Sequence, residues 1–402
     1  MQIAGIITEY NPLHAGHLYH IARTRQLLGP DAAVICVMSG NFVQRGDFAL
    51  VRKHARAEAA VRGGADLVLE LPLPWAISSA EAFAEGGVRT LLATGLVTHL
   101  SFGSECADAS ILRETAAALL SPEYQAGLQR FLGEGMSYAA CRQAVAGALI
   151  GPEKAACLSR PNDNLGVEYC KALLRHGSPV QPMAIRREGA GHDSQDLTGA
   201  TASAGAIRRL LREGRREEAL SRMAPAMRQS YWAEEAAGRA PVRSETCERA
   251  ILARLRSMTQ ADFQALDTGK EGLGNRLYDA VRQSATLEEL LSAAKTKRYA
   301  HARLRRMVLW AYLGLTPADV PDEPPYVRVL SANAAGRELL ARMRRCAAVP
   351  VLTKPADVRL LSEAARRLFA LEVRATGLYT LAYPDLHAAL PGAEWREGPV
   401  IL

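Results

Sequence analysis

Two histidines, His14 and His17, stand close together in the segment ITEYNPLHAGHLYH, residues 7–20. An imidazole ring can donate hydrogen bonds to phosphoryl oxygens, which gain negative charge in the transition state of a nucleotidyl transfer. Gly16, between the two histidines, has no side chain and lets a ligand approach the backbone closely. The pattern therefore predicts a site that binds and polarises phosphate groups.

The elements on either side of this segment support that interpretation. The apolar run QIAGIIT predicts a buried strand, and residues 17–29 have apolar side chains at helical spacing up to Gly29-Pro30. Ligands of parallel sheets bind beyond the carboxyl ends of strands, and a helix N-terminus offers free N–H groups to a phosphate. This placement favours phosphate binding over the alternative of two surface or helix-capping histidines.

A metal site is the second chemistry that a histidine pair could support. No carboxylate or cysteine lies at a suitable spacing to complete the ligand set, so we expect no metal held by the protein. His20 lies one helical turn beyond His17, and we expect it on the helix face rather than on the phosphates.

Strand and helix patterns alternate through the first half of the chain. Buried strands are predicted at 32–40, 66–74, 99–105 and 181–188, and helices at 48–65 and 79–96, while residues 108–150 are expected to be mostly helical. A polar, Gly-rich loop at 189–205 leads into a basic helix at 204–220. This alternation predicts an α/β fold, a Rossmann-like parallel sheet covered by helices on both faces.

Helical patterns dominate the second half, at 248–258, 272–283, 287–314 and 360–379. A chain of 402 residues is more than one domain usually holds. We therefore predict a nucleotide-binding domain at 1–225 and a mainly α-helical domain at 226–402.

Composition narrows the class of protein. The seven cysteines form no CxxC pair, so neither a zinc site nor a disulfide framework is indicated. No apolar run reaches eighteen residues, and the first residues lack a basic segment and a cleavage site, so we expect a cytoplasmic protein that does not bind membranes. The net charge of +7 permits a polyanionic partner, and nothing indicates a protein partner.

Two basic segments could contact such a polyanion. KTKRYAHARLRRM places several cations around Tyr299, and RRLLREGRR, residues 208–216, adds a second strip. A charge run usually forms a solvated face, but cations around an aromatic ring also suit RNA phosphates and stacked bases. The candidates for RNA binding are Lys295, Lys297, Arg298, Arg303 and Arg306.

Longer segments carry a family resemblance. HAGH resembles the HxGH motif of the nucleotidyltransferase superfamily. EYNPLHAGHLYH, SGNFVQRGDFALVRKHARAEAA, GADLVLELP, FGSE and RPNDNLGVEY, in this order, resemble the tRNA(Met) cytidine acetate ligase family. KTKRYAHARLRRM and ANAAGRELL continue the resemblance into the second half of the chain.

The resemblance implies a reaction. The family uses ATP and acetate to form acetyl-adenylate and pyrophosphate, and then acetylates N4 of the wobble cytidine of elongator tRNA(Met). ATP is a co-substrate, and Mg²⁺ is expected to accompany its phosphates. Two alternatives stay open from the residues alone: a nucleotidyltransferase for a small phosphorylated acceptor, and an RNA-binding protein with a degenerate nucleotide site.

The resemblance also implies ATP contacts, with His14 and His17 on the phosphates as the catalytic pair. Gly103, Asn162 and Arg187 match further ATP contacts, and Arg186 is the alternative to Arg187. The segment that wraps the nucleotide comprises Ile7, Thr8, Glu9, Tyr10, Asn11, Pro12, Leu13, His14, Ala15, Gly16, His17, Leu18, Tyr19 and His20.

Two further loops complete the expected site. In the phosphate loop the chain keeps Ser203 and Arg208 but has Gly205 where relatives commonly have threonine, which leaves Thr201, Ser203 and backbone N–H groups as donors. The loop SGNFVQRGD carries Asn41, Gln44 and Arg45, which we expect to face acetate or the target cytidine.

Overall fold

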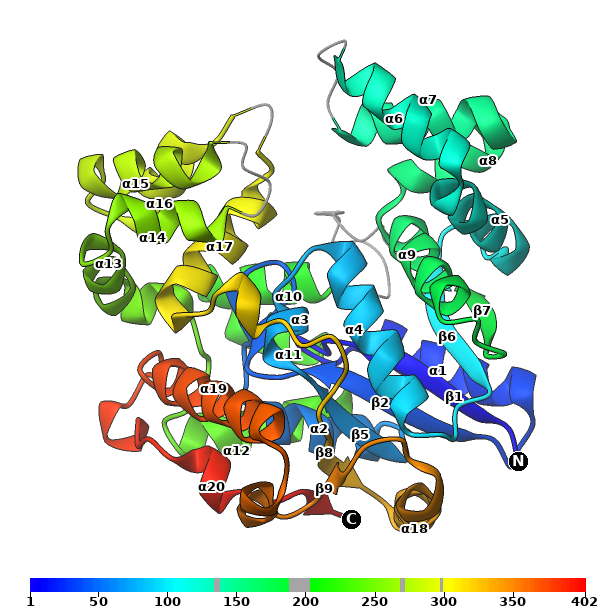
Figure 1. Cartoon of the computed structure of the whole chain (residues 1–402). Helices are drawn as coiled ribbons and strands as arrows, with labels where there is room; N and C mark the ends of the chain where they lie inside the picture. The colour runs from blue at the N-terminus through cyan, green and yellow to red at the C-terminus, as the bar shows by residue number, and fades with distance from the viewer. Residues whose placement is uncertain (134–137, 188–202, 268–271, 297–298) are drawn as a thin grey trace.

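One twisted sheet forms the centre of the molecule in the computed structural model, which describes residues 1–133, 138–187, 203–267, 272–296 and 299–402 (Figure 1). The strand order is β10-β8-β5-β2-β1-β6-β7, with β9 beside β8. The strands are β1 (Ile3–Thr8), β2 (Ala33–Ser39), β5 (Leu67–Leu71), β6 (His99–Ser104), β7 (Gln181–Arg186), β8 (Val327–Ala332), β9 (Val351–Leu352) and β10 (Val400–Ile401). The predicted α/β class with a parallel sheet is confirmed.

Both faces of the sheet are covered, which explains why β1 and β2 are apolar along almost their whole length. Alternate residues of β1 enter different cores: Ile7 packs with α4 (Ala80–Ala93) and α9 (Pro161–Arg175), whereas Ile6 packs with α2 (Lys53–Arg62) and α12 (Pro225–Ala236). Helix α1 (Ala15–Leu28) lies on the second of these faces, where Ile21 joins the core.

The strand order reverses at β1. Strands β2 and β5 follow on one side of β1, whereas β6 and β7 follow on the other, and all of these neighbours pair in parallel. The connections that leave the carboxyl ends of β1 and β6 therefore run to opposite faces, and a crevice opens between them. The segment with His14 and His17 lies at this point.

The second half of the chain contributes more to the sheet than its sequence suggested. Besides its helices it supplies β8, which pairs antiparallel with β5, and the short strands β9 and β10. The run YVRVLSA was not recognised as a strand because Arg328 interrupts its apolar pattern. The proposed division at residue 225 stays a prediction.

Two predicted helices are each divided. The helix expected at 204–220 ends as α10 (Ala204–Arg212) and resumes as α11 (Arg216–Ser221), because Gly214 adopts a left-handed φ of 77°. The helix expected at 287–314 is α16 (Leu287–Ala294) followed by α17 (His301–Leu313).

Two groups of helices stand at opposite upper corners of the molecule in Figure 1. One group is α5 (Ala109–Leu120), α6 (Pro122–Gly133), α7 (Tyr138–Ile150) and α8 (Pro152–Ala155). The other consists of α13 (Glu248–Arg256), α14 (Gln260–Leu266), α15 (Leu273–Gln283), α16 and α17. The chain ends with α18 (Ala334–Cys346), α19 (Glu363–Thr380), α20 (Ala393–Arg396) and β10.

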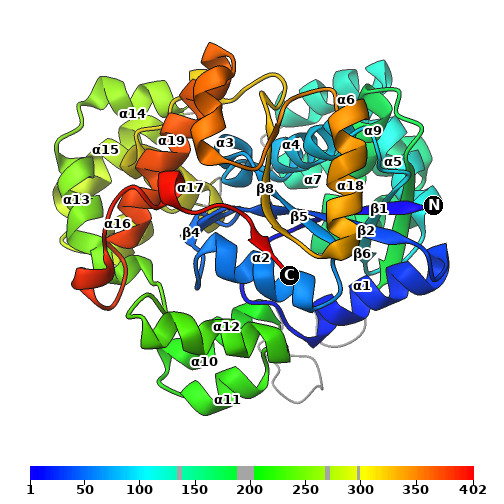
Figure 2. The same cartoon turned by 90° about the horizontal axis from the view of Figure 1, so that it is seen from below.

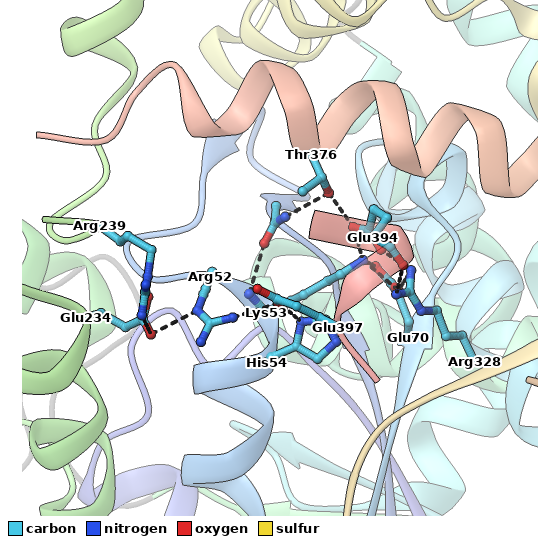
Figure 3. Close-up of polar contacts among 11 residues, drawn as sticks. Arg52, Lys53, His54, Glu70, Glu234, Arg239, Arg328, Thr376, Glu394 and Glu397 are labelled. Carbon is cyan, nitrogen blue, oxygen red and sulfur yellow. Dashed lines mark hydrogen bonds and ion pairs between the residues drawn. The ribbon is translucent and has the colours of Figure 1, made fainter. Parts of the chain in front are cut away.

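A buried network of charged side chains joins the two halves of the chain (Figure 3). The Lys53 ammonium lies 2.7 Å from a Glu70 carboxylate oxygen and 2.6 Å from one of Glu394. Arg328 pairs with Glu394 and lies 3.5 Å from Glu70. Two cations thus face two carboxylates at full burial, which is the condition under which buried charges are tolerated.

The network continues toward α12 through a second set of pairs. Arg52 contacts Glu397 at 2.7 Å and Glu234 at 2.9 Å, while the His54 ring lies 3.0 Å from Glu397. Arg239 also bonds to Glu234 at 2.8 Å. These contacts fix the start of α2 against residues more than 180 positions later in the sequence.

Glu372, close to this network, should make stability depend on pH. Burial, and then the charge of Glu70, raises its pKa from 4.5 to about 8. Between these values the folded protein holds a proton that the unfolded chain releases, so this group makes the free energy of unfolding fall as pH rises. Each unit of pKa shift corresponds to about 1.4 kcal/mol, so the expected effect is on the order of a few kcal/mol.

Denaturant unfolding of the wild type and of Glu372→Gln at pH 5 and pH 8 tests this expectation. The glutamine cannot titrate but can still accept the 2.8 Å hydrogen bond from the Leu73 N–H. The wild type should lose more stability than the variant between the two pH values, and equal losses would contradict the assignment.

Candidate active site

A cavity of about 530 Å³ opens at the carboxyl ends of β1, β6 and β7. The structure brings most of the predicted site residues to it from six separate segments of the chain. Those on its lining are Ile7, Thr8, Glu9, Tyr10, Asn11, His14, Gly16, His17, Tyr19, His20, Gln44, Arg45, Gly103, Asn162, Arg187, Ser203 and Arg208. Pro12, Leu13, Ala15, Leu18 and Asn41 do not line it.

The two histidines are held by the turn that starts α1. The His14 Nδ1 atom accepts a hydrogen bond from the Gly16 N–H at 3.1 Å, and His17 Nδ1 accepts one from the His14 N–H at 3.3 Å. Their rings stack with centroids 3.7 Å apart. Because each Nδ1 is an acceptor, a neutral ring carries its proton on Nε2 and can donate it there. Capping of the helix and binding of a phosphate are therefore compatible roles.

Four helices begin at this cavity. First-turn residues of α1, α4, α9 and α10 line it, among them Gly16, Ala80, Asn162 and Gly205. Each helix N-terminus carries a partial positive charge and N–H groups without partners in the helix. Their convergence favours a ligand with several negative charges.

Two donors in the wall of the cavity have no partner among the described residues. They are the Asn11 Nδ2 and Arg208 Nε atoms, both buried. Arg208 is anchored by its Nη1 atom, which donates to the Asn11 carbonyl at 2.6 Å, and burial lowers the pKa of its guanidinium. Buried polar groups are almost always hydrogen-bonded, so these orphan donors fit a polar ligand such as ATP.

Asn162 lies in the first turn of α9 and not in a free turn, contrary to the simplest interpretation of its sequence. Pro161 starts this helix, a position where its missing N–H costs nothing. The Glu105 carboxylate accepts from the Asn162 side chain at 2.6 Å, and Asp163 in turn accepts from the Glu105 N–H at 2.8 Å. These reciprocal bonds make FGSE and RPND one structural unit, a role of Glu105 and Asp163 that the sequence analysis missed.

Arg187, the residue that directly follows β7, is half-buried. Its Nη1 atom donates to Asn162 Oδ1 at 3.3 Å, and its side chain lies against Gly103. Burial lowers the pKa of Arg187. Arg186 is exposed, although it also touches the rim of the cavity.

His20 lies on the face of α1 that packs on β6, as expected. Its Nε2 atom and the Ser101 hydroxyl are 2.9 Å apart. Burial, together with the charge of Arg187, lowers the His20 pKa to about 4. His20 is therefore neutral near pH 7 and cannot supply charge to a phosphate.

Arg56, which the sequence analysis did not select, fixes the loops that follow β1 and β2. Its guanidinium is fully buried and donates to the carbonyls of Val51 at 2.8 Å, Glu9 at 2.5 Å and Ser39 at 3.1 Å, and also to the Gly40 carbonyl. Burial lowers its pKa to about 10. Nothing in the sequence distinguishes Arg56 from the other charged residues of α2, KHARAEAAVR.

The polar residues of the loop after β2 have two different roles. The Gln44 N–H donates to Glu9 Oε1 at 2.7 Å at the cavity wall. Asn41 instead donates to the Thr376 hydroxyl at 3.0 Å and accepts from the Lys53 N–H at 2.9 Å. We expected Asn41 to face a substrate, but its side chain is buried between the loop and α19.

The structure describes the phosphate loop from Ser203 onward. The Ser203 hydroxyl caps α10 by accepting from the Ala206 N–H at 3.1 Å. A Cβ atom at Gly205 would meet Ser203 Oγ at 3.7 Å, an ordinary contact, so the missing threonine reflects no lack of space. Thr201 lies outside the described residues.

The two basic segments converge on one hairpin beside the cavity, formed by β3 (Phe42–Val43) and β4 (Asp47–Phe48). Arg212 of α10 and Arg305 of α17 lie 3.4 and 3.8 Å from the Asp47 carboxylate. The Arg306 Nη1 atom donates to the Gln44 carbonyl at 3.4 Å, and burial lowers its pKa to about 10.

The other predicted RNA contacts are placed differently. Lys295 is exposed, and Arg303 lies 3.7 Å from Asp267. Tyr299 is only 6% exposed and packs in the core of the helices, so the expectation that it stacks on a base is wrong. Lys297 and Arg298 lie outside the described residues.

The described residues were compared with the requirements of a metal site and of a membrane-spanning helix. They contain no group of three or more His, Cys, Asp and Glu side chains placed to hold a metal ion. None of their helices is long and apolar enough to cross a bilayer.

Comparisons with known proteins place the chain in a family. The model of the HIGH Nucleotidyl Transferase family matches residues 1–390. A tRNA(Met) cytidine acetate ligase of Acetivibrio thermocellus is 35% identical over all of both chains, and that of Fervidobacterium nodosum is 34% identical over 98% of each. The chain belongs to the tRNA(Met) cytidine acetate ligase family.

Solved structures agree with membership of the tRNA(Met) cytidine acetate ligase family. The apo crystal structure of Thermotoga maritima TmcAL is 34% identical, covers all of both chains and superposes with a TM-score of 0.95. TmcAL bound with alpha-thio ATP gives a TM-score of 0.93 at the same identity and coverage. The resemblance inferred from HAGH, SGNFVQRG and RPNDNLG is thus confirmed.

Proposed function

We propose that this chain is an ATP-dependent ligase that activates acetate as acetyl-adenylate and acetylates N4 of the wobble cytidine of elongator tRNA(Met). One observation carries the proposal: the cavity at the reversal of strand order joins His14, His17 and four helix N-termini in a chain that aligns end to end with tRNA(Met) cytidine acetate ligases. The protein would act in the cytoplasm, where tRNA is modified.

In the first step an acetate oxygen attacks the α-phosphorus of ATP, and the bond to pyrophosphate breaks. His14 and His17 donate from Nε2 to the phosphate oxygens that gain charge, while Arg187 and Arg208 neutralise the chain of phosphates. Mg²⁺, bound through these same oxygens, would supply further neutralisation. The step needs no covalent enzyme intermediate, so position and charge supply the catalysis.

In the second step N4 of cytidine attacks the acetyl carbonyl carbon, and the bond from that carbon to the AMP oxygen breaks. The attacking nitrogen must release a proton. Glu9 is placed to accept it, because its carboxylate lines the cavity and is held by the Gln44 N–H, while Arg56 holds the backbone of the same residue. Burial raises the pKa of Glu9, which makes the carboxylate a stronger base.

Glu9→Gln should separate the two steps. The amide keeps an oxygen for the Gln44 N–H but cannot accept a proton, so acetyl transfer to tRNA should slow by about 10²–10⁴. Acetyl-adenylate formation, measured as acetate-dependent exchange of labelled pyrophosphate into ATP, should stay close to the wild-type rate. Equal losses in both assays would show that Glu9 serves ATP binding instead.

The proposal that the chain binds tRNA rests on the arginines that gather around the β3–β4 hairpin. Arg212, Arg305 and Arg306 lie there with Arg45 and Arg208 of the cavity, so the phosphates that flank a base in the cavity would meet cations. The tRNA substrate would be bound first by this charge and positioned by contacts with the hairpin.

Mass spectrometry of elongator tRNA(Met) after incubation with ATP and acetate tests the function directly. A mass gain of one acetyl group on the wobble cytidine is expected. Adenylylation of a small phosphate, with no change in tRNA, would favour the nucleotidyltransferase alternative. Binding of tRNA without any turnover of ATP would favour the degenerate RNA-binding alternative.

A further inference from the structure

A second cavity, of about 560 Å³, lies far from the ATP site along the sheet. One wall is α18, where Arg337, Leu340, Ala341 and Arg344 form a stripe at helical spacing. The other walls are the segment 353–356 with Lys354 and the C-terminal residues from Trp395 to Ile401. Figures 1 and 2 both show α18 close to the C-terminus of the chain.

The cations of this groove have no acidic partners within the described part of the chain, in contrast to some arginines elsewhere. Arg62 pairs with Glu58 and Arg89 with Glu85. Helix α18 carries four arginines and one glutamate. Within the described part of the chain none of these four guanidinium groups, nor the Lys354 ammonium, forms an ion pair. The groove therefore presents uncompensated positive charge from two elements.

An aromatic ring completes the groove. Trp395 is 40% exposed, although one edge packs against Phe369 with ring centroids 4.6 Å apart. The Arg359 guanidinium lies 5.4 Å from the Trp395 ring centre. Cations arranged beside an exposed, rigid ring suit the phosphates and bases of an RNA strand better than a purely charged peptide.

The position of the groove indicates which part of an RNA it would meet. The ATP site lies at β1 and β6, whereas α18 follows β8, three strands from β1 in the sheet. At about 4.8 Å between strands, β8 is on the order of 14 Å from β1. A cytidine that occupies the ATP cavity cannot also fill the groove, so a different part of the same RNA must reach it.

We propose that the groove formed by α18, residues 353–356 and residues 395–401 binds the sugar-phosphate backbone of the tRNA substrate at a part of the tRNA other than the wobble cytidine. The inference rests on the proposed function, because it takes tRNA as the substrate. Arg337, Arg344 and Lys354 contact phosphates, and Trp395 provides a surface for sugar or base. The groove gives affinity without reading sequence.

The double variant Arg337→Ala/Arg344→Ala of the full chain tests the proposal. Its affinity for intact elongator tRNA(Met) should fall about tenfold or more, and the slope of log affinity against log salt should decrease by about two, one per lost phosphate contact. Lys354→Ala should give a smaller loss in the same direction.

A matched control removes the same charge elsewhere. Arg62→Ala/Arg89→Ala also loses two cations, but both are already paired with acids, so affinity and salt slope should stay near wild-type values. Acetate-dependent pyrophosphate exchange without tRNA reports that each variant is folded and that the first step operates.

Two outcomes would overturn the proposal. They are an unchanged salt slope in the Arg337/Arg344 variant, and an equal loss of affinity in the control variant. An acidic peptide that displaces tRNA from the wild type but not from the variant would identify a protein partner instead. Absence of acetate-dependent exchange in the wild type would refute the proposed function itself, independently of the groove.

Discussion

His17→Ala is expected to reduce acetyl-adenylate formation by about 10²–10³, the usual cost of removing one hydrogen-bond donor to a charge that develops in the transition state. The His17 ring lines the cavity, and its Nδ1 atom accepts from the His14 N–H, so a neutral ring carries its proton on Nε2. Acetate-dependent exchange of pyrophosphate into ATP measures the effect. Binding of tRNA, which depends on the basic surface outside the histidine pair, should change little.

Two further variants sharpen this result. His17→Gln keeps an N–H donor near the position of Nε2 and should retain more exchange activity than His17→Ala. His176→Ala removes a histidine that pairs with Glu85 on the surface and should leave exchange unchanged. If exchange survives in His17→Ala, the ring has no role in polarising the phosphates.

Lys53→Met should cost about 3–5 kcal/mol of folding free energy, as expected when one partner of a buried ion pair is removed. Methionine fills a similar volume but leaves the carboxylates of Glu70 and Glu394 to share Arg328 alone (Figure 3). Denaturant unfolding at pH 7 gives the difference in the free energy of unfolding.

The matched comparison for Lys53 is an exposed pair. Arg62→Ala breaks the pair with Glu58 on the surface of α2 and should cost about 0.5 kcal/mol or less. In the double variant Lys53→Met/Glu70→Gln one carboxylate charge is removed with the ammonium, so part of the lost stability should return. If Lys53→Met costs no more than Arg62→Ala, the network contributes little to the attachment of the C-terminal segment.

Short segments of the sequence determined much of the fold and the position of the histidine pair. An apolar run followed by NPLHAGH fixes a strand, a turn and a helix start within 20 residues, because buried strands and helix ends are specified by neighbours in the chain. The parallel α/β fold followed from the repetition of that pattern. Gly103, Asn162, Arg187 and Ser203 were instead selected through the family resemblance, and in the structure each lies at the end of a strand or the start of a helix.

The roles of other side chains depended on partners that only folding supplies. Asn41 and Gln44 are three residues apart in one loop. The Asn41 side chain bonds to Thr376 away from the cavity, whereas the Gln44 N–H bonds to Glu9 at the cavity wall. Tyr299 stands among cations in the sequence but packs in a core.

Long-range contacts also decided where the second half of the chain lies. From the sequence alone Lys53 has the pattern of a surface cation on an amphipathic helix. In the structure it is buried between Glu70 and Glu394. Arg328 breaks an apolar pattern that is nevertheless a strand, because the same carboxylates neutralise its charge. A sequence pattern shows the polarity of a residue. The environment of that residue depends on side chains that are often distant in the sequence, and only the tertiary structure brings those side chains together.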